Sequence, residues 1–202
     1  MESKRTQAGR SAATRAGLVA AARPLFAEHG YAGVGTDQIA RAAGVSRGAL
    51  YHQFADKEDL FLAVFEQVEA ELVARLGAGL AAADPNDPVA MMHADIDGWL
   101  AACAEPEVHR IVLIEAPAAL GWERWREVGR RYGVGLVEMA VQSLMDAGAI
   151  APQPVRPLAH VLVGALEEAA LYAARAENRE AATAEVRAAL VRVFDGLLTS
   201  SR

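Results

Sequence analysis

The chain has 202 residues, 53% of them hydrophobic, which suffices for one large domain or for a small domain and a larger one with a sizeable core. No apolar run reaches the roughly 20 residues that a membrane-spanning helix needs, and no apolar stretch typical of a secretory signal follows the N-terminal charges. Cys103 is the single cysteine, which excludes an internal disulfide and a cysteine metal cluster. We therefore expect a soluble cytoplasmic protein with no membrane partner.

The charges are distributed unevenly along the chain. Residues 1–57 contain eight Lys or Arg and four acidic residues, a net charge of +4, whereas the remainder contains twelve Arg and 22 acidic residues, a net charge of −10. Because phosphate binding is electrostatic, a basic N-terminal segment on an acidic protein favours a nucleic-acid partner for that segment. An excess of this size is also within ordinary scatter, so charge alone does not decide the point.

Helical periodicity runs along nearly the whole chain, and no strand-like alternation interrupts it. The first ten residues or so are expected to form a flexible tail, followed by a helix over 11–29 that contains Pro24. A proline inside a helix costs about 3 kcal/mol and bends it, so either this helix is kinked or its boundary lies elsewhere. After a glycine-rich break at 30–35, two short helices are expected over 36–43 and 47–54.

A longer helix is predicted over about 56–76, because apolar residues recur there at i, i+4 spacing, and a loop is predicted over 77–88. A further break is expected around 117–121. The remaining predicted helices are 89–104, 107–114, 122–147, 155–177 and 180–199. The sequence therefore predicts an all-α protein of about nine helices, with a head of residues 1–60 that contains three helices and a body of residues 61–202.

Residues 36–54 carry the most informative pattern in the chain. Thr36 and Ser46 are predicted N-caps of the two short helices, since their hydroxyl groups can accept free backbone N–H groups of a first turn. Gly44 can adopt the left-handed conformation that ends a helix and turns the chain. Two short helices joined by a glycine turn form a helix-turn-helix, in which the second helix enters the DNA major groove.

The outward face of the second short helix carries hydrogen-bond donors and small residues. Arg47 can donate two parallel hydrogen bonds to guanine, the commonest specific base contact, and the small residues beside it allow close approach to the bases. Tyr51, His52 and Lys57 are donors suited to phosphate oxygens, although Tyr51 and His52 also fit a packing role. The predicted DNA-binding residues are Thr36, Ser46, Arg47, Gly48, Ala49, Tyr51, His52 and Lys57.

An enzyme is the rival interpretation of the same segment. Residues 44–48 fit the pattern G-x-S-x-G of the hydrolase nucleophile elbow, which requires a buried strand before it. Residues 39–43 form an alanine-rich helical turn instead. No carboxylate pair, no nucleophile beside a base and no phosphate-binding loop supports an enzyme, so no catalytic residue and no cofactor is predicted.

The stretch over 15–65 resembles the N-terminal domain of TetR-type repressors. Pro24 departs from the family pattern, which puts the straightness of the first helix in question. The resemblance implies an all-helical homodimer that binds an inverted-repeat operator in double-stranded DNA and has a C-terminal domain for ligand binding and dimerisation. The matching residues are Thr36, Ile39, Ala40, Ala43, Gly44, Val45, Ser46, Gly48, Tyr51, Phe54, Lys57 and Leu60.

All three tryptophans lie in the body, where they could line a mostly apolar cavity together with methionines, which suit an adaptable pocket. For each of these residues the alternative is a place in an ordinary core. Glu105 and His109 are paired at helical spacing, but such a pair is a weak signal, so no metal site is predicted. The predicted pocket residues are Met92, Trp99, Cys103, Ile111, Trp122, Trp125 and Tyr132.

The last two predicted helices are amphipathic, and an ordinary core could use their apolar faces. The family resemblance implies instead that they pair with their symmetry mates through Leu158, Leu162, Leu166, Val186, Leu190 and Phe194. A small-molecule effector in the body is then expected to shift the helix over 56–76, alter the spacing of the two heads and release the DNA. A regulator without a ligand, and one that activates some promoters, remain alternatives.

Overall fold

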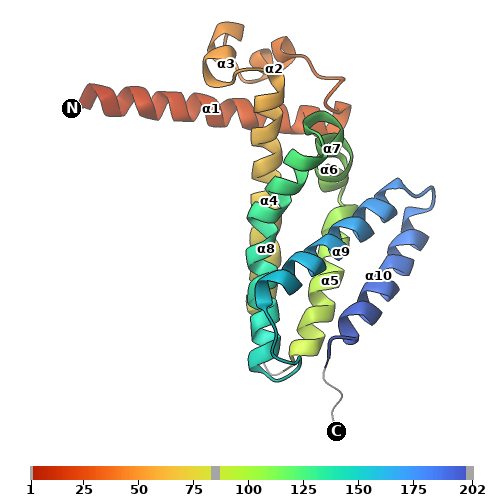
Figure 1. Ribbon diagram of the computed structural model, residues 1–202. Helices are drawn as coiled ribbons and strands as arrows, with labels where there is room; N and C mark the ends of the chain where they lie inside the picture. The colour runs from red at the N-terminus through yellow and green to blue at the C-terminus, as the bar shows by residue number, and fades with distance from the viewer. Residues whose placement is uncertain (1, 83–86, 199–202) are drawn as a thin grey trace.

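A computed structural model describes residues 2–82 and 87–198 of the chain (Figure 1). Every named element in these two ranges is a helix, which confirms the all-α prediction. The helices of the head lie across one end of the longest body helices, and α4 (Lys57–Ala82) runs from the head along the body. No helix in the described ranges is both long enough and apolar enough to cross a membrane.

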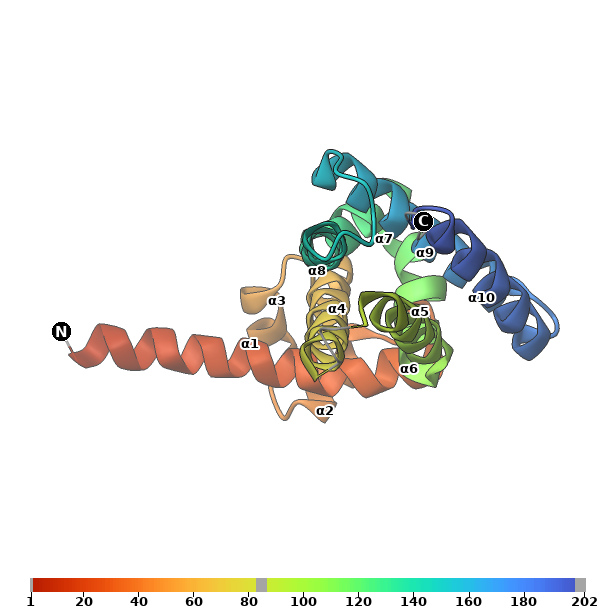
Figure 2. The ribbon, with the colours of Figure 1, turned by 90° about the horizontal axis from the view of Figure 1, so that it is seen from below.

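The head consists of α1 (Glu2–His29), α2 (Thr36–Ala42) and α3 (Arg47–Gln53). Because α1 begins at Glu2, residues 2–10 of the expected flexible tail belong to the first helix, whose N-terminal part extends beyond the rest of the molecule (Figures 1 and 2). Met1 lies outside the described residues. The helix continues through Pro24, which is exposed, so the carbonyl group that loses its hydrogen bond can be hydrated.

Two of the predicted boundaries in the body are wrong. The helix α4 continues to Ala82 through the start of the predicted loop, and part of that loop, residues 83–86, lies outside the described residues. The break expected around 117–121 is confined to Gly121, because Pro117 occupies the first turn of a short helix, where its missing N–H is not needed. The body helices are α5 (Pro88–Ala104), α6 (Pro106–Val108), the π-helix η1 (His109–Glu115), α7 (Ala116–Leu120), α8 (Trp122–Asp146), α9 (Val155–Arg175) and α10 (Arg179–Asp195).

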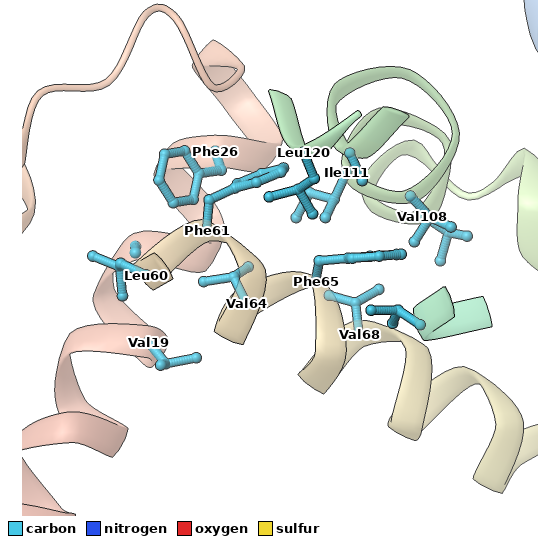
Figure 3. Packing of buried hydrophobic residues seen from close by; sticks show 14 of the residues in the cluster. Val19, Phe26, Leu60, Phe61, Val64, Phe65, Val68, Val108, Ile111 and Leu120 are labelled. Carbon is cyan, nitrogen blue, oxygen red and sulfur yellow. The ribbon is translucent and has the colours of Figure 1, made fainter. Parts of the chain in front are cut away.

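One hydrophobic core is shared by the head and the body (Figure 3). Phe61 of α4 is fully buried, and its ring lies edge-on to Phe26 of α1 with the ring centroids 5.0 Å apart. Ile111 and Leu120 of the body belong to the same cluster as these two phenylalanines. The apolar packing is therefore continuous from the head, residues 1–60, into the body. A movement of the head relative to the body would have to rearrange this core.

Candidate nucleic-acid interface and ligand cavity

The turn between α2 and α3 has the geometry that the sequence predicts. Gly44 has a φ of 68°, in the left-handed region that favours glycine. The Ser46 side chain accepts a hydrogen bond from the Ala49 backbone N–H at 3.1 Å, which confirms it as the N-cap of α3. Leu50 and Ile39 are buried in the core between the two helices, so the opposite face of α3 is left toward solvent.

Thr36 does not cap α2, because Gly35 occupies the N-cap position and Thr36 is the first helical residue. The Thr36 hydroxyl instead forms a hydrogen bond of 3.2 Å with the Tyr51 hydroxyl. This contact, followed by the Arg47 guanidinium, lowers the pKa of Tyr51. Tyr51 is 42% exposed, and its ring is held against α2 at the surface.

Arg47 is available for contact with another molecule. Its side chain is 62% exposed, its nearest acidic partner is Asp37 at 3.4 Å, and its guanidinium lies 5.5 Å from the centre of the Tyr51 ring. Gly48 and His52 are exposed on the same short helix, and Ala49 is half-buried. The outward face of α3 therefore presents a cation, a phenol, an imidazole and small residues together.

Lys57 is not the free surface donor that the sequence suggests. Its ammonium group donates hydrogen bonds to the carbonyl oxygens of Tyr31 at 3.0 Å and Val34 at 3.1 Å. It also lies 4.1 Å from the centre of the Tyr31 ring. These contacts tie the start of α4 to the turn between α1 and α2.

The body contains a cavity of about 420 Å³ whose lining comes mainly from α4, α5, α8, α9 and α10. Of the predicted pocket residues, Met92, Trp99 and Trp125 line it. The Trp99 indole N–H donates to the Leu166 carbonyl oxygen at 3.1 Å, and the Trp125 N–H donates to the Val112 carbonyl oxygen at 2.8 Å. Since both indole N–H groups already donate to backbone carbonyl oxygens, the two tryptophans contribute only their ring surfaces to the cavity lining.

The other four predicted pocket residues do not line this cavity. Cys103 and Ile111 are buried in the core shared with the head, and Tyr132 packs against that core. Trp122 is exposed, with its ring centroid 4.8 Å from that of Trp125. The cavity extends along α8 from Trp125 toward its C-terminus, so a residue at the first position of the helix lies beyond its end.

Two buried acids line the cavity, and sequence reasoning did not find them. Glu69 of α4 and Glu167 of α9 are 5% and 8% exposed. Burial, with the charge of Glu167 adding to it, raises the pKa of Glu69 to about 7. Burial also raises the pKa of Asp95, a third acid in the lining, to about 6. One sequence feature could have identified Glu69: it is an acid within the apolar stripe of its helix, between Phe65 and Val73 at i, i+4 spacing.

Glu167 lacks a full set of partners. Its Oε2 atom lies 3.5 Å from Nη2 of Arg126, yet this buried oxygen makes no hydrogen bond, and Nε of Arg126 is also buried without one. Gly129 of α8 makes room for the carboxylate, since a Cβ atom built there would lie 2.8 Å from Oε1 of Glu167. In the described part of the chain, no group of three His, Cys, Asp or Glu is placed to hold a metal ion.

Family models match both parts of the chain. Residues 18–64 match bacterial regulatory proteins of the tetR family, and residues 89–197 match the C-terminal domain of tetracyclin repressor-like proteins. The chain belongs to the TetR family. It is thus a DNA-binding transcriptional regulator with a helix-turn-helix, in a family whose members regulate transcription and are not enzymes.

Known TetR-family proteins resemble this chain over different lengths. A regulator from Pectobacterium atrosepticum, known from its crystal structure, is 36% identical, with 96% of this chain and 98% of that chain covered and a TM-score of 0.86. The regulator CymR of Pseudomonas putida is 44% identical, but the match covers 43% of this chain and 42% of CymR, less than half of either. The TetC protein of transposon Tn10 in Escherichia coli is 24% identical over 99% of this chain and 98% of TetC.

The residues expected at a TetR-type dimer interface belong to the second hydrophobic core of the protomer. Leu162, Leu190 and Phe194 are buried there, and the other three expected residues are half-buried. Three apolar residues on the outer faces of α9 and α10 are exposed instead: Val161 by 67%, Tyr172 by 58% and Val193 by 55%. The six residues expected at the interface are Leu158, Leu162, Leu166, Val186, Leu190 and Phe194, and Leu162, Leu166 and Phe194 also line the cavity.

Polar contacts join the head to the π-helix beside the cavity. The Glu115 carboxylate, at the end of η1, accepts hydrogen bonds from the Tyr31 backbone N–H at 3.0 Å and from Nε of Arg110 at 2.8 Å. Val112 and Leu113 of the same π-helix line the cavity. The segment that touches the cavity therefore also holds the end of α1.

Proposed function

We propose that this protein is a homodimeric repressor that binds an inverted-repeat operator through α3 and leaves it when a small, largely apolar or aromatic effector occupies the body cavity. The outward face of α3 supports the proposal most strongly, because Arg47 and its neighbours are exposed on a helix-turn-helix. Arg47 would read a guanine, while Tyr51 and His52 would contact phosphate oxygens and set the register. We expect the protein to act in the cytoplasm, where its operator would be.

A nuclease footprint on the DNA that flanks the protein's own gene tests this function. We expect two protected half-sites that form an inverted repeat, with centres one helical turn of about 34–36 Å apart or a multiple of that distance. The spacing follows from two heads related by a two-fold axis. A folded protein that protects no inverted repeat, at salt concentrations low enough to favour phosphate contacts, would contradict the proposal.

The dimer would form through the outer faces of α9 and α10, where the exposed apolar residues Val161, Tyr172 and Val193 lie. In a two-fold interface each of these residues would be buried against the same surface of the partner. Val161→Glu would bury an unpaired charge there, so we expect the dissociation constant of the dimer, measured by analytical ultracentrifugation, to rise about 100-fold or more.

Tyr51→Glu is the matched control, because it also places a carboxylate at an exposed aromatic or aliphatic position, but in the head. We expect this variant to sediment as the unmodified protein does. If Val161→Glu left the dimer as strong as before, the outer face of α9 would not be the interface.

The effector would act on the head through η1 and α4, which both line the cavity. A ligand that pushes on Val112 or Leu113 would move Glu115, which holds Tyr31 at the end of α1. A ligand that separates α4 from α8 would disturb Phe61, which packs against Phe26 in the head. The effector can shift the head only to the extent that it binds the two arrangements with different affinities.

A further inference from the structure

We infer that the body cavity selects a lipophilic cation, a ring system carrying a protonated amine or a similar positive group, with Glu69 and Glu167 as counter-charges and Trp99 and Trp125 as aromatic walls. The selectivity of the cavity follows from its lining residues alone. Only the description of this cation as the effector rests on the proposed function.

The charge of the lining is one-sided. Its ionisable residues are Glu69, Asp95 and Glu167, and the described residues that line the cavity include no Lys, Arg or His. Glu69 and Glu167 come from different helices, and the charge of Glu167 makes ionisation of Glu69 more costly, whereas Arg126 and Arg130 favour the ionised form of Glu167. An anionic ligand would add a further like charge, so the lining disfavours it.

The Glu69 carboxylate lacks a donor, and the Glu167 carboxylate is only loosely paired. In the described chain the Glu69 side chain makes no hydrogen bond and no ion pair, whereas Glu167 lies 3.5 Å from Arg126 without a hydrogen bond. An ionised carboxylate can only accept hydrogen bonds, and a buried polar group is normally satisfied by a partner. A ligand that enters this cavity must therefore bring hydrogen-bond donors to be complementary, and a positive donor also offsets the buried charge.

The aromatic walls favour the same ligand chemistry. The indole N–H groups of Trp99 and Trp125 are bound to backbone carbonyl oxygens, so the rings offer the cavity π surface without a competing donor. A tryptophan face attracts a cation, and the attraction is stronger when both are shielded from water. A neutral alcohol or phenol could donate to Glu69, but it would not offset the charge of the ionised carboxylate as a cation does.

Three probes that share one ring system test the inference: 1-naphthylmethylammonium, 1-naphthylmethanol and 1-naphthoate. Each is titrated into the full-length protein at neutral pH, with binding followed by calorimetry. We expect the ammonium probe to bind at least about tenfold tighter than the alcohol, as a charge-assisted hydrogen bond gives, and the carboxylate to bind most weakly. Equal affinity for the ammonium and the alcohol, or tightest binding of the carboxylate, would overturn the inference.

Charge-neutral variants then identify the groups responsible. Glu69→Gln and Glu167→Gln keep the side-chain shape, and each should reduce the preference for the ammonium over the alcohol severalfold. Glu123→Gln removes an exposed carboxylate of α8 outside the cavity lining, so it should leave the preference unchanged. Thermal melting checks that each variant is folded. If both cavity variants keep the full preference for the ammonium probe over the alcohol, Glu69 and Glu167 are not the counter-charges.

Operator binding by the same preparations separates this inference from the proposed function. Preferential binding of the ammonium probe with no effect on the operator complex would contradict ligand-controlled release but leave the cavity's selectivity standing. Release of the operator by all three probes with equal potency would support ligand control and overturn the selectivity.

Discussion

Arg47→Ala is expected to weaken operator binding by roughly 5- to 150-fold, which corresponds to the about 1–3 kcal/mol that a bidentate arginine–guanine contact contributes. The substitution should leave the fold and the dimer intact, because Arg47 is 62% exposed and its one acidic neighbour, Asp37, is held loosely at 3.4 Å. An exposed ion pair of this kind contributes little to stability. Fluorescence anisotropy with a labelled operator duplex measures the effect.

Two further variants make the Arg47 experiment specific. Arg47→Lys keeps the charge but loses the planar pair of donors, so we expect it to lose sequence preference while it retains binding to unrelated DNA. Arg179→Ala removes an exposed arginine at the start of α10 and should leave operator affinity unchanged. If Arg47→Ala binds the operator as the unmodified protein does, α3 is not the reading helix.

Glu115→Ala is expected to loosen the head on the body. It removes the acceptor of the Tyr31 backbone N–H and of Nε of Arg110, so the free energy of unfolding should fall by about 1–3 kcal/mol. The amides of residues 30–35, which Glu115 helps to hold, should exchange with solvent faster. Hydrogen exchange followed by mass spectrometry measures this local change, and denaturant unfolding measures the global one.

Glu115→Gln and Glu123→Ala serve as an intermediate variant and a control for Glu115→Ala. The glutamine retains an oxygen that can accept from Tyr31 but loses the negative charge beside Arg110, so its effect should be intermediate. Glu123 is an exposed acid of α8, and its removal should change neither measurement. Exchange at 30–35 that is the same in Glu115→Ala as in the unmodified protein would show that η1 does not hold the head.

The helix-turn-helix could be predicted from the sequence because its signals are local. Gly44 ends one helix and Ser46 begins the next, and both effects depend on a residue's own backbone and its near neighbours. The prediction that Thr36 caps α2 rested on the same local reasoning and is wrong. Gly35 occupies the cap position, and the Thr36 hydroxyl forms a hydrogen bond with Tyr51 on another helix. A tertiary partner thus overrode the expected local contact.

The cavity and the outer face of α9 depend on how helices pack. Periodicity shows that α9 is apolar on more than one side, but it does not reveal that Leu162 faces its own core while Val161 faces outward. In the same way, an acid such as Glu69 is usually solvated, and only the packing of α4 against α5 and α8 makes it a cavity residue. Three of seven predicted pocket residues were therefore found from composition, and the acids that determine the cavity's charge were not.

Interference by methylation at guanine N7 tests most directly whether α3 reads the major groove. N7 is exposed in that groove and is one of the two acceptors that a bidentate arginine uses. We expect methylation of a guanine in each half-site to block binding of the unmodified protein, and the Arg47→Ala variant to have lost its sensitivity to that guanine. Identical interference patterns for the two proteins, or interference confined to adenine N3 in the minor groove, would contradict the assignment of α3 as the reading helix.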